Sequence, residues 1–319
     1  MIWRQLFLST ALLTLLAGSA QAEAQRVTLL SFNMWGAGAN EQKPIDETVA
    51  VIKASGADII GVQETVPEPD PCTADVCAAT GNSRAKDVAA ALGYHYHEFE
   101  HNTDNHWADA VISRFPFGKE TPNGVGVEID MNGRKVVAYS MNLDDAPYQP
   151  YQLLNIEYGD SPFLRTADET IKAASETRGK ALALLLADIK SMTDAGAQFV
   201  MGDFNEPSHL DWTEKAAAAG RHPLAVEYPT TKAVEAEGFV DTFRVAFPDE
   251  MAKPGVTWTP TSEPTDPEDH HDRIDFVFAK AKNLKVISAG IVGEKAPEAD
   301  LVVTPWPSDH RASMAVVEF

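Results

Sequence analysis

The chain has 319 residues, and its 47 acidic side chains outnumber its 26 lysines and arginines, which gives a formal charge of −21. This length suffices for one large domain or two small ones with a sizeable core. The acidic balance argues against general electrostatic binding of nucleic acid, because such binding depends on lysine and arginine. An anionic substrate would need a local attraction, most simply from a bound metal ion.

The first 22 residues have the features of a secretory signal peptide. Arg4 precedes the apolar run LFLSTALLTLLAG, which is short for a membrane span, and Ala20-Gln21-Ala22 is a small-x-small cleavage site. The alternative is an N-terminal membrane anchor. We expect cleavage after residue 22, which leaves residues 23–319 as one domain of a secreted or periplasmic protein without a transmembrane segment.

The two cysteines of the chain, Cys72 and Cys77, stand close together in the stretch PEPDPCTADVC. In an oxidising compartment such a pair forms a disulfide that closes a loop. A zinc site would need a second pair of ligands, and the sequence contains no partner CxxC motif. We therefore expect a disulfide between these two residues.

Apolar, strand-like runs recur along the whole chain after residue 25. In chain order they are RVTLLSFNMW, ADIIGVQE, ADAVISRF, KVVAYSMNL, AQFVMGDFN, RIDFVFA, LKVISAGIV and ASMAVVEF. Helical patterns lie between several of them, at residues 44–55, which begin with a proline, and at residues 166–194, which contain none. No internal repeat or low-complexity tract interrupts this order. Strands that alternate with helices and end in polar residues predict a layered α/β or α+β domain.

Polar side chains stand where the predicted strands end. Asn33 closes the first run, Glu64 closes the second, and Asp203 and Asn205 close the run AQFVMGDFN. Residues two apart on a strand point to the same face, so we expect Asp203 and Asn205 to project together. A simple turn is the alternative interpretation, because glycine, aspartate, asparagine and proline all favour turns.

Two further polar groups stand near the C-terminus. Asp275 belongs to the run RIDFVFA, and the pair Asp309-His310 precedes the last strand. Each fragment alone has a structural explanation, because polar residues at strand ends are normal. Their combination in one chain favours a single functional site.

The chain resembles the endonuclease/exonuclease/phosphatase superfamily, which includes deoxyribonuclease I, exonuclease III, neutral sphingomyelinases and inositol polyphosphate 5-phosphatases. The matching segments stand in the family's order and span residues 28–319; they are SFNMW, GVQET, AVISRFPF, GDFNEP, Thr257-Trp258, RIDFVF and SDHRA. GDFN followed by a late SDH is the specific part of the match. The resemblance implies a four-layer α/β sandwich, in which two packed, mixed β-sheets are flanked by helices, with one metal-assisted site at the ends of the sheets.

Hydrolysis of an anionic phosphate ester needs charge neutralisation, a base and in-line attack by water. The resemblance implies that Glu64 binds Mg²⁺, with Asn33 and Asp309 completing or supporting the site, and with Mn²⁺ or Ca²⁺ as alternative ions. It also implies that Asp203 activates or orients the attacking water, while Asn205 holds a phosphoryl oxygen.

The resemblance also implies a dyad of His310 and Asp275, in which the carboxylate fixes the tautomer of the ring and favours its charged form. His310 is then either a base or a stabiliser of charge. Many relatives place a second histidine after the central strand, in a pattern like N-x-H-L, where this chain has Asn142. An amide binds a phosphoryl oxygen but cannot transfer a proton, which argues against a two-histidine scheme.

Three other segments carry reactive side chains. The segment HYHEFEHNTDNHWAD contains His106 and Asp109, which either belong to a polar loop or contact substrate or a second metal. The segment DPEDHHD, residues 266–272, is either a solvated acidic loop or an extra metal subsite. Tyr148 and Tyr151 either form the wall of a pocket or pack against the surface.

Together these features predict an exported, monomeric, metal-dependent hydrolase of a small or lipid-derived phosphoester, a diester or a monoester. A deoxyribonuclease-like endonuclease is the second candidate, and the excess of acidic residues disfavours its nucleic-acid substrate. A catalytically inactive binding module on the same fold is the third, and it is disfavoured because the main site residues are all present.

Overall fold

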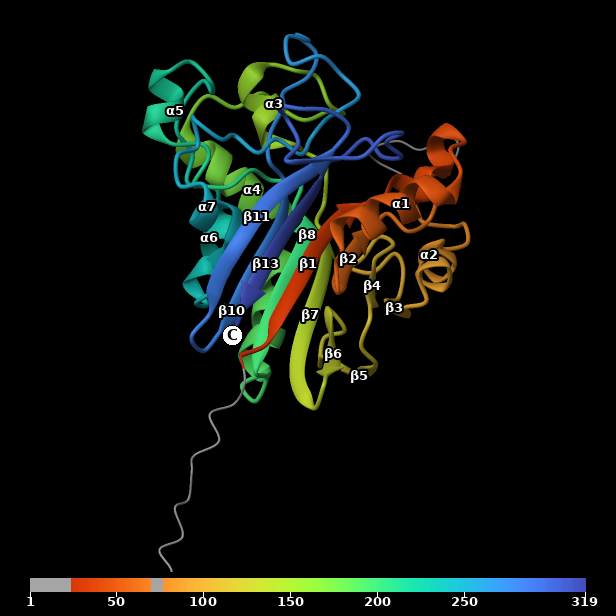
Figure 1. Cartoon of the computed structure of the whole chain (residues 1–319). Helices are drawn as coiled ribbons and strands as arrows, with labels where there is room; N and C mark the ends of the chain where they lie inside the picture. Colours follow the sequence, from red (N-terminus) through yellow and green to blue (C-terminus); the bar gives the residue numbers. More distant parts are fainter. Residues whose placement is uncertain (1–23, 70–76) are drawn as a thin grey trace, which may run out of the picture.

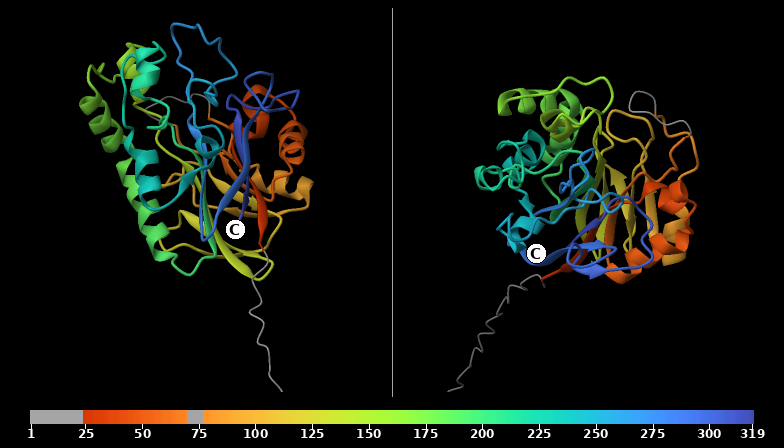
Figure 2. Two further views of the ribbon diagram at one scale, coloured as in Figure 1. Left: turned by 60° about the vertical axis from the view of Figure 1, so that its left-hand side comes forward. Right: turned by 90° about the horizontal axis from the view of Figure 1, so that it is seen from above.

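The computed structural model of the protein describes residues 24–69 and 77–319. Two β-sheets pack face to face with helices outside them, which is the predicted four-layer arrangement (Figures 1 and 2). The expected signal peptide and Cys72 lie outside the described residues, so the cleavage and the disulfide stay predictions. Within the described ranges, no helix combines the length and the apolar character needed to cross a membrane.

The first sheet has seven strands in the order β12-β11-β13-β1-β2-β4-β3. β1 pairs in parallel with β2 and antiparallel with β13, so the sheet is mixed. Its strands are β1 (Arg26–Asn33), β2 (Ile59–Gln63), β3 (His95–Glu98), β4 (Ala110–Ser113), β11 (Lys285–Gly293), β12 (Leu301–Val302) and β13 (Ala312–Glu318).

The second sheet has six strands in the order β5-β6-β7-β8-β10-β9. It is also mixed, because β8 pairs in parallel with β7 and antiparallel with β10. Its strands are β5 (Phe117–Glu120), β6 (Gly126–Met131), β7 (Arg134–Asn142), β8 (Ala197–Asp203), β9 (Val240–Asp241) and β10 (Asp275–Ala281).

The central strand β1 shows how an apolar run fits this architecture. Val27 and Leu29 point into the core between the two sheets, whereas Leu30 and Phe32 point into the core beneath the helices. A strand that is buried on both faces reads as a continuous apolar run instead of an alternating pattern. Each of the eight predicted runs contains a strand of the structure, which confirms the predicted strand content.

Helices cover the outer face of each sheet. α1 (Ile45–Ser55) and α2 (Ala85–Leu92) pack on the first sheet, and α4 (Ala167–Ser191) packs on the second. A capping box begins α4: the Thr166 hydroxyl accepts the Glu169 N–H, and the Glu169 carboxylate accepts the Thr166 N–H. The remaining helices are η1 (Trp35–Glu41), α3 (Gln149–Leu154), α5 (Glu214–Ala218), α6 (Pro229–Ala236) and α7 (Thr242–Ala246).

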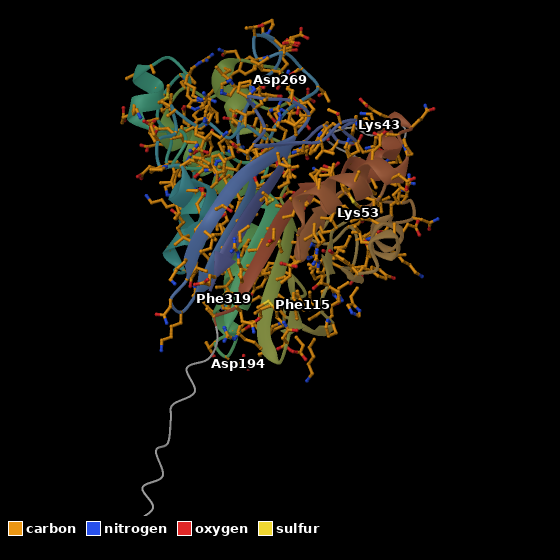
Figure 3. The ribbon with its side chains drawn as sticks, viewed as in Figure 1. Lys43, Lys53, Phe115, Asp194, Asp269 and Phe319 are labelled. Atoms are coloured by element: carbon orange, nitrogen blue, oxygen red, sulfur yellow. The ribbon has the colours of Figure 1, made fainter. Side chains whose placement is uncertain are left out.

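Strand register brings the polar strand ends together. Asn142 and Asp203 pair across the parallel strands β7 and β8, and Asp275 pairs with Asp203 across the antiparallel strands β10 and β8. The loops at this end of the sheets include Asp269, whereas Asp194 lies at the opposite end of the molecule (Figure 3). Three neighbouring strands therefore present a polar residue at the same edge.

Candidate active site

A histidine between two carboxylates forms the centre of the site. Nδ1 of His310 lies 3.0 Å from Oδ2 of Asp275, and Nε2 lies 3.5 Å from Oδ2 of Asp203. All three residues are buried, and the His310 ring packs against Trp258 with 4.9 Å between ring centroids. The structure thus brings together the two members of the predicted dyad and adds Asp203 on the other ring nitrogen.

Two side chains of this centre, Asp203 and His310, have raised pKa values. Burial raises the pKa of Asp203 to about 7, and the neighbouring Asp275 adds to the rise while His310 opposes it. Burial lowers the pKa of His310, but Asp275 and Asp203 outweigh it and raise that pKa well above its ordinary value. The ligand atoms of the three groups all lie within 4.8 Å of one another, as in a metal site. A protonated imidazole has no lone pair for a metal, however, so the centre is better suited to acid–base chemistry.

Asn33, at the end of β1, connects the two sheets. Its Nδ2 donates to Oε1 of Glu64 at 2.7 Å and to Oδ2 of Asp203 at 3.1 Å. Its Oδ1 accepts the backbone N–H of Trp35 at 3.1 Å. Asn33 therefore orients two carboxylates of the site, which fits the supporting role that the sequence left open beside direct coordination.

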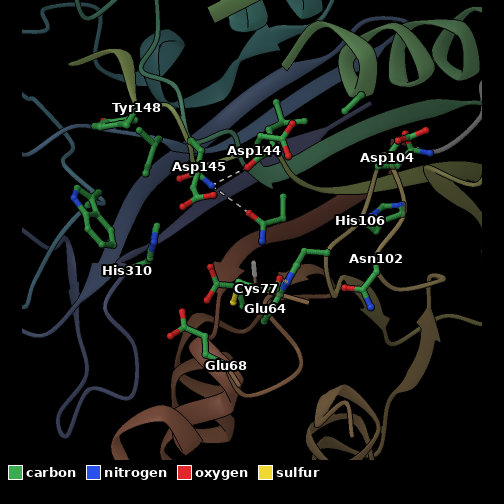
Figure 4. Close-up of a pocket in the computed structure, with 18 of the residues that line it drawn as sticks. Glu64, Glu68, Cys77, Asn102, Asp104, His106, Asp144, Asp145, Tyr148 and His310 are labelled. Atoms are coloured by element: carbon green, nitrogen blue, oxygen red, sulfur yellow. Dashed lines mark hydrogen bonds between the residues drawn. The ribbon is translucent and has the colours of Figure 1, made fainter. Parts of the chain in front are cut away.

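Glu64 adopts an uncommon backbone conformation directly after β2. Its φ of 51° lies in the left-handed region, which residues other than glycine rarely occupy. The N–H of Gly36 donates to the Glu64 carbonyl at 2.8 Å, and the N–H of Met34 donates to the Gln63 carbonyl at 3.1 Å. These bonds hold the turn that places the Glu64 side chain on the pocket wall (Figure 4).

The acids Glu64 and Asp309 fit a divalent cation. Burial and the nearby Asp309 carboxylate raise the pKa of Glu64 well above its ordinary value, and burial also raises the pKa of Asp309. Two carboxylates that disfavour each other's ionised form are stabilised by a cation that both contact. Carboxylate oxygens are ligands that Mg²⁺ accepts in proteins. These two side chains are therefore the residues that would hold the ion, with Asn33 positioning Glu64.

The motif GDFN is a turn and a part of the pocket at once. The backbone N–H of Asn205 donates to Oδ1 of Asp203 at 2.9 Å, and Asn205 has a φ of 47°. Its Nδ2 donates to the Leu143 carbonyl at 2.9 Å and to Oδ1 of Asn142 at 3.3 Å. Asn205 and Asn142 both line the pocket, so the two interpretations of this motif do not exclude each other.

A pocket of about 680 Å³ opens above these groups (Figure 4). Among the described residues, no lysine or arginine lines it. Tyr148 and Tyr151 are part of its wall, which is the first of the two placements that the sequence allowed. The acidic and the large aromatic lining residues are Glu64, Glu68, Asp104, Asp144, Asp145, Asp309, Trp107, Tyr148, Tyr151, Tyr158 and Trp258.

His106 and Asp109 have a supporting position. Nδ1 of His106 lies 2.7 Å from Oδ2 of Asp109, and Nε2 lies 3.1 Å from the Gly124 carbonyl oxygen. His106 borders the pocket, but both of its ring nitrogens already have protein partners. Asp109 is fully buried behind it. This arrangement stabilises the pocket wall and does not bring Asp109 to the pocket.

Two site residues were not singled out from the sequence. Trp258 packs on His310 and lines the pocket, and Thr257 fixes the start of β10 because its Oγ1 accepts the N–H groups of Ile274 and Asp275 at 3.0 and 3.1 Å. The dipeptide Thr257-Trp258 was the available signal, since it is one of the segments that carry the family resemblance.

Comparisons with known proteins give relatives of this chain in sequence and in fold. A protein of Caenorhabditis elegans described as uncharacterized is 26% identical over 339 residues, covering 100% of both chains. The structure of an endonuclease/exonuclease/phosphatase family protein from Leptotrichia buccalis has a TM-score of 0.54 at 18% identity and covers 92% of this chain and 100% of its own. The 3′ phosphatase NExo from Neisseria, bound to a product DNA hairpin, has a TM-score of 0.53 at 14% identity, with coverage of 91% and 98%.

At these identities the two solved structures support the fold alone. The model of the Endonuclease/Exonuclease/phosphatase family matches residues 30–310, a range that includes the strand-end residues from Asn33 to His310. The chain therefore belongs to the endonuclease/exonuclease/phosphatase family.

Proposed function

We propose that this protein hydrolyses a small or lipid-derived phosphoester with the help of a divalent cation. The observation that carries the proposal is that Glu64, Asp309 and His310 line one pocket, while the buried Asp203 and Asp275 contact the His310 ring. Glu64 and Asp309 form a pair suited to a cation, and the buried group of Asp203, His310 and Asp275 is suited to proton transfer.

Each residue has a distinct task in this scheme. When bound, the cation neutralises charge on the phosphoryl group. Asp203 orients the attacking water and accepts its proton, since a pKa of about 7 suits a general base near neutral pH. Asn205 donates to a phosphoryl oxygen when its Nδ2 gives up the 3.3 Å bond to Oδ1 of Asn142, and the Asn142 amide donates to a second phosphoryl oxygen. His310 is held in its charged form by Asp275, which favours charge stabilisation over the role of base.

The charge of the pocket supports a small substrate. Six acidic side chains line it, and among the described residues it contains no lysine or arginine that would follow a phosphate backbone. The three tyrosines and two tryptophans that also line the pocket offer apolar surface to a substituent of the phosphate. A phosphoester with one phosphate and an apolar or uncharged substituent therefore fits better than a polyanion.

A nuclease is the second candidate, favoured by the fold shared with NExo, whose structure contains a product DNA hairpin. Two substrates separate the candidates: supercoiled plasmid and a simple aryl phosphodiester, each tested with Mg²⁺. Hydrolysis of the aryl ester with intact plasmid supports the proposal. Efficient plasmid nicking would favour the nuclease, and inactivity on both, and on a panel of sphingomyelin and inositol phosphates, would favour a binding module.

Replacement of Glu64 by glutamine should raise the Mg²⁺ concentration that gives half-maximal activity by at least about 10-fold. Loss of an outer-shell partner of a metal ligand already weakens binding about 10- to 100-fold, and Glu64 is assigned as a ligand itself. The variant keeps the shape of the side chain and loses its charge. Asp104→Asn is the matched control, because Asp104 lines the same pocket but is ion-paired with Lys180 at 2.7 Å. Equal Mg²⁺ titrations for wild type and Glu64→Gln would contradict the assignment.

Export is part of the proposal and rests on the signal-like N-terminal segment. Cell fractionation should find the mature chain outside the cytoplasm, beginning after Ala22. A thiol assay on the unfolded, unreduced exported protein should detect neither Cys72 nor Cys77, as a disulfide predicts. A cytoplasmic chain that retains its first 22 residues would contradict export, and two titratable thiols would contradict the disulfide.

A further inference from the structure

A second group of possible metal ligands lies behind one wall of the pocket. His222 belongs to the loop between α5 and α6, while His270 and Asp272 belong to the loop that leads into β10. Nδ1 of His222 lies 3.2 Å from Nε2 of His270, which lies 3.8 Å from Oδ1 of Asp272. One ligand atom from each residue lies within 4.8 Å of the others.

These spacings suit a small divalent cation. Zinc binds imidazole nitrogen and carboxylate oxygen at about 2.0–2.2 Å, so two of its tetrahedral ligands stand roughly 3.4 Å apart. The separations of 3.2 and 3.8 Å lie close to that value. Two histidines and one carboxylate also form a known donor set for zinc, in which water takes the fourth position.

Neighbouring side chains hold the three possible ligands in place, as the outer-shell residues of a metal site hold its ligands. The Trp212 indole N–H donates to Oδ1 of Asp272 at 2.9 Å, and the Tyr148 hydroxyl donates to Oδ2 at 2.9 Å. The Trp212 ring stacks on His222 with 4.1 Å between centroids and meets the His270 ring edge-on at 5.7 Å. Such partners orient metal ligands and tune their basicity.

Hydrogen bonds within the protein do not pair every polar atom of this group. His222 is 5% exposed; its Nδ1, which faces His270, is the nitrogen that would bind the ion, and its Nε2 has no hydrogen-bond partner among the described residues. Besides the Trp212 ring contacts and the approach of His270 to Asp272, the two imidazoles share a single hydrogen bond.

We propose that His222, His270 and Asp272 bind one zinc ion, separate from the catalytic cation. The ion joins the loop after α5 to the loop before β10. Asp272 stands three residues before Asp275 and bonds to Tyr148, which lines the pocket. The zinc therefore stabilises the pocket wall and the start of β10, and its presence does not depend on the identity of the substrate.

The test measures zinc per chain after chelation and dialysis against Zn²⁺, with excess Mg²⁺ to occupy the catalytic position. Wild type and Glu64→Gln should each retain one zinc, while His222→Gln and His270→Gln should retain much less. His271→Gln is the matched control, because His271 is adjacent in sequence but contacts Ser262 and Asp269. Melting of the metal-free variants near the metal-free wild type shows that they are folded.

Two further measurements make the result specific. Co²⁺ should give the visible absorption of a tetrahedral nitrogen and oxygen site in wild type and in His271→Gln, and not in His270→Gln. Tyr148→Phe should weaken zinc binding about 10- to 100-fold, the usual effect of losing an outer-shell hydrogen bond. Zinc retention by His270→Gln equal to that of wild type, or loss of the zinc in Glu64→Gln but not in His270→Gln, would overturn the proposal.

Discussion

An Asp203→Asn variant should lose roughly 10²- to 10⁴-fold in kcat, the range over which a general base contributes, while its fold is kept. Asparagine is nearly isosteric, and its side-chain oxygen can still accept the Asn205 N–H that Oδ1 of Asp203 accepts at 2.9 Å. It cannot accept a proton from water. The variant therefore separates the catalytic role of the motif from its role as a turn.

The stability of the same variant should depend less on pH than that of the wild type. Burial raises the pKa of Asp203 from 3.8 to about 7 in the folded chain. The stabilisation linked to this shift is full below the ordinary pKa and is lost as the pH rises through about 7. At pH 8 the metal-free wild type must ionise a buried group that the variant lacks, although the variant loses the Oδ2 acceptor of Asn33. The melting temperature of Asp203→Asn should therefore fall less between pH 6 and pH 8 than that of the wild type.

Kinetics and thermal melts at pH 6 and pH 8 measure both effects. Asp130→Asn serves as the control, because Asp130 is an exposed residue near the end of β6 and accepts the Gly133 N–H at 2.6 Å, far from the site. A folded Asp203→Asn protein that turns over within about tenfold of wild type would leave this motif as a turn alone, since a general base contributes more than that.

The largest effect on stability should come from Arg273→Met, which should lower the free energy of unfolding by about 3–5 kcal/mol, the usual cost of breaking a buried ion pair. Arg273 lies between two buried carboxylates. Its Nε donates to Oδ2 of Asp211 at 2.9 Å, and its second terminal nitrogen donates to Oδ2 of Asp241 at 2.8 Å. Without the guanidinium, the two carboxylates keep fewer partners. Asp211 still accepts a hydrogen bond from Arg244, and Asp241 still accepts backbone N–H groups.

The sign of the pH dependence follows from Asp211. Burial raises its pKa, but Arg273 and Arg244 outweigh burial and hold that pKa below the ordinary value of 3.8. The stabilisation is present above pH 3.8 and is lost as the pH falls through the lower, folded-state pKa. Denaturant unfolding should therefore show the difference between wild type and Arg273→Met at pH 7 and a smaller one in acid.

Lys215→Met is the matched control for this prediction. Lys215 pairs with Asp249 at 2.6 Å, but both side chains are more than half exposed. Exposed pairs contribute little to stability because water already solvates both charges. If Arg273→Met and Lys215→Met both unfold at the same denaturant concentration as wild type, the ion pairs of Arg273 with Asp211 and Asp241 do not stabilise the fold.

The sequence predicted the core strands because each is a long apolar run with a polar end. It did not predict the short edge strands, such as β5 and β9, since FGKE and VD carry no apolar period. The predicted helix over residues 166–194 ends at Ser191, where the chain turns toward β8. Its start was more informative, because the threonine and glutamate of the capping box are local signals.

The site was predictable to the extent that strand ends carry it. Asp203 and Asp275 meet through the register of β8 and β10, and His310 reaches them from just before β13, a strand of the other sheet. His222 could not be connected with Asp272, because α6, β9, α7 and long loops lie between them and no local motif marks the contact. The supporting role of His106 was equally hidden, since the partner of its Nε2 is a backbone carbonyl, which any residue supplies.

Metal-dependent hydrolysis of a simple aryl phosphodiester by the purified wild-type protein tests the central claim most directly. Turnover is measured with a chelator, after readdition of Mg²⁺, and in the Asp203→Asn variant under both conditions. The proposed mechanism predicts that the chelator abolishes wild-type turnover and that Mg²⁺ restores it. Asp203→Asn should show little turnover either in the chelator or after readdition of Mg²⁺. Turnover that continues in the chelator, or that the variant retains in full, would contradict it.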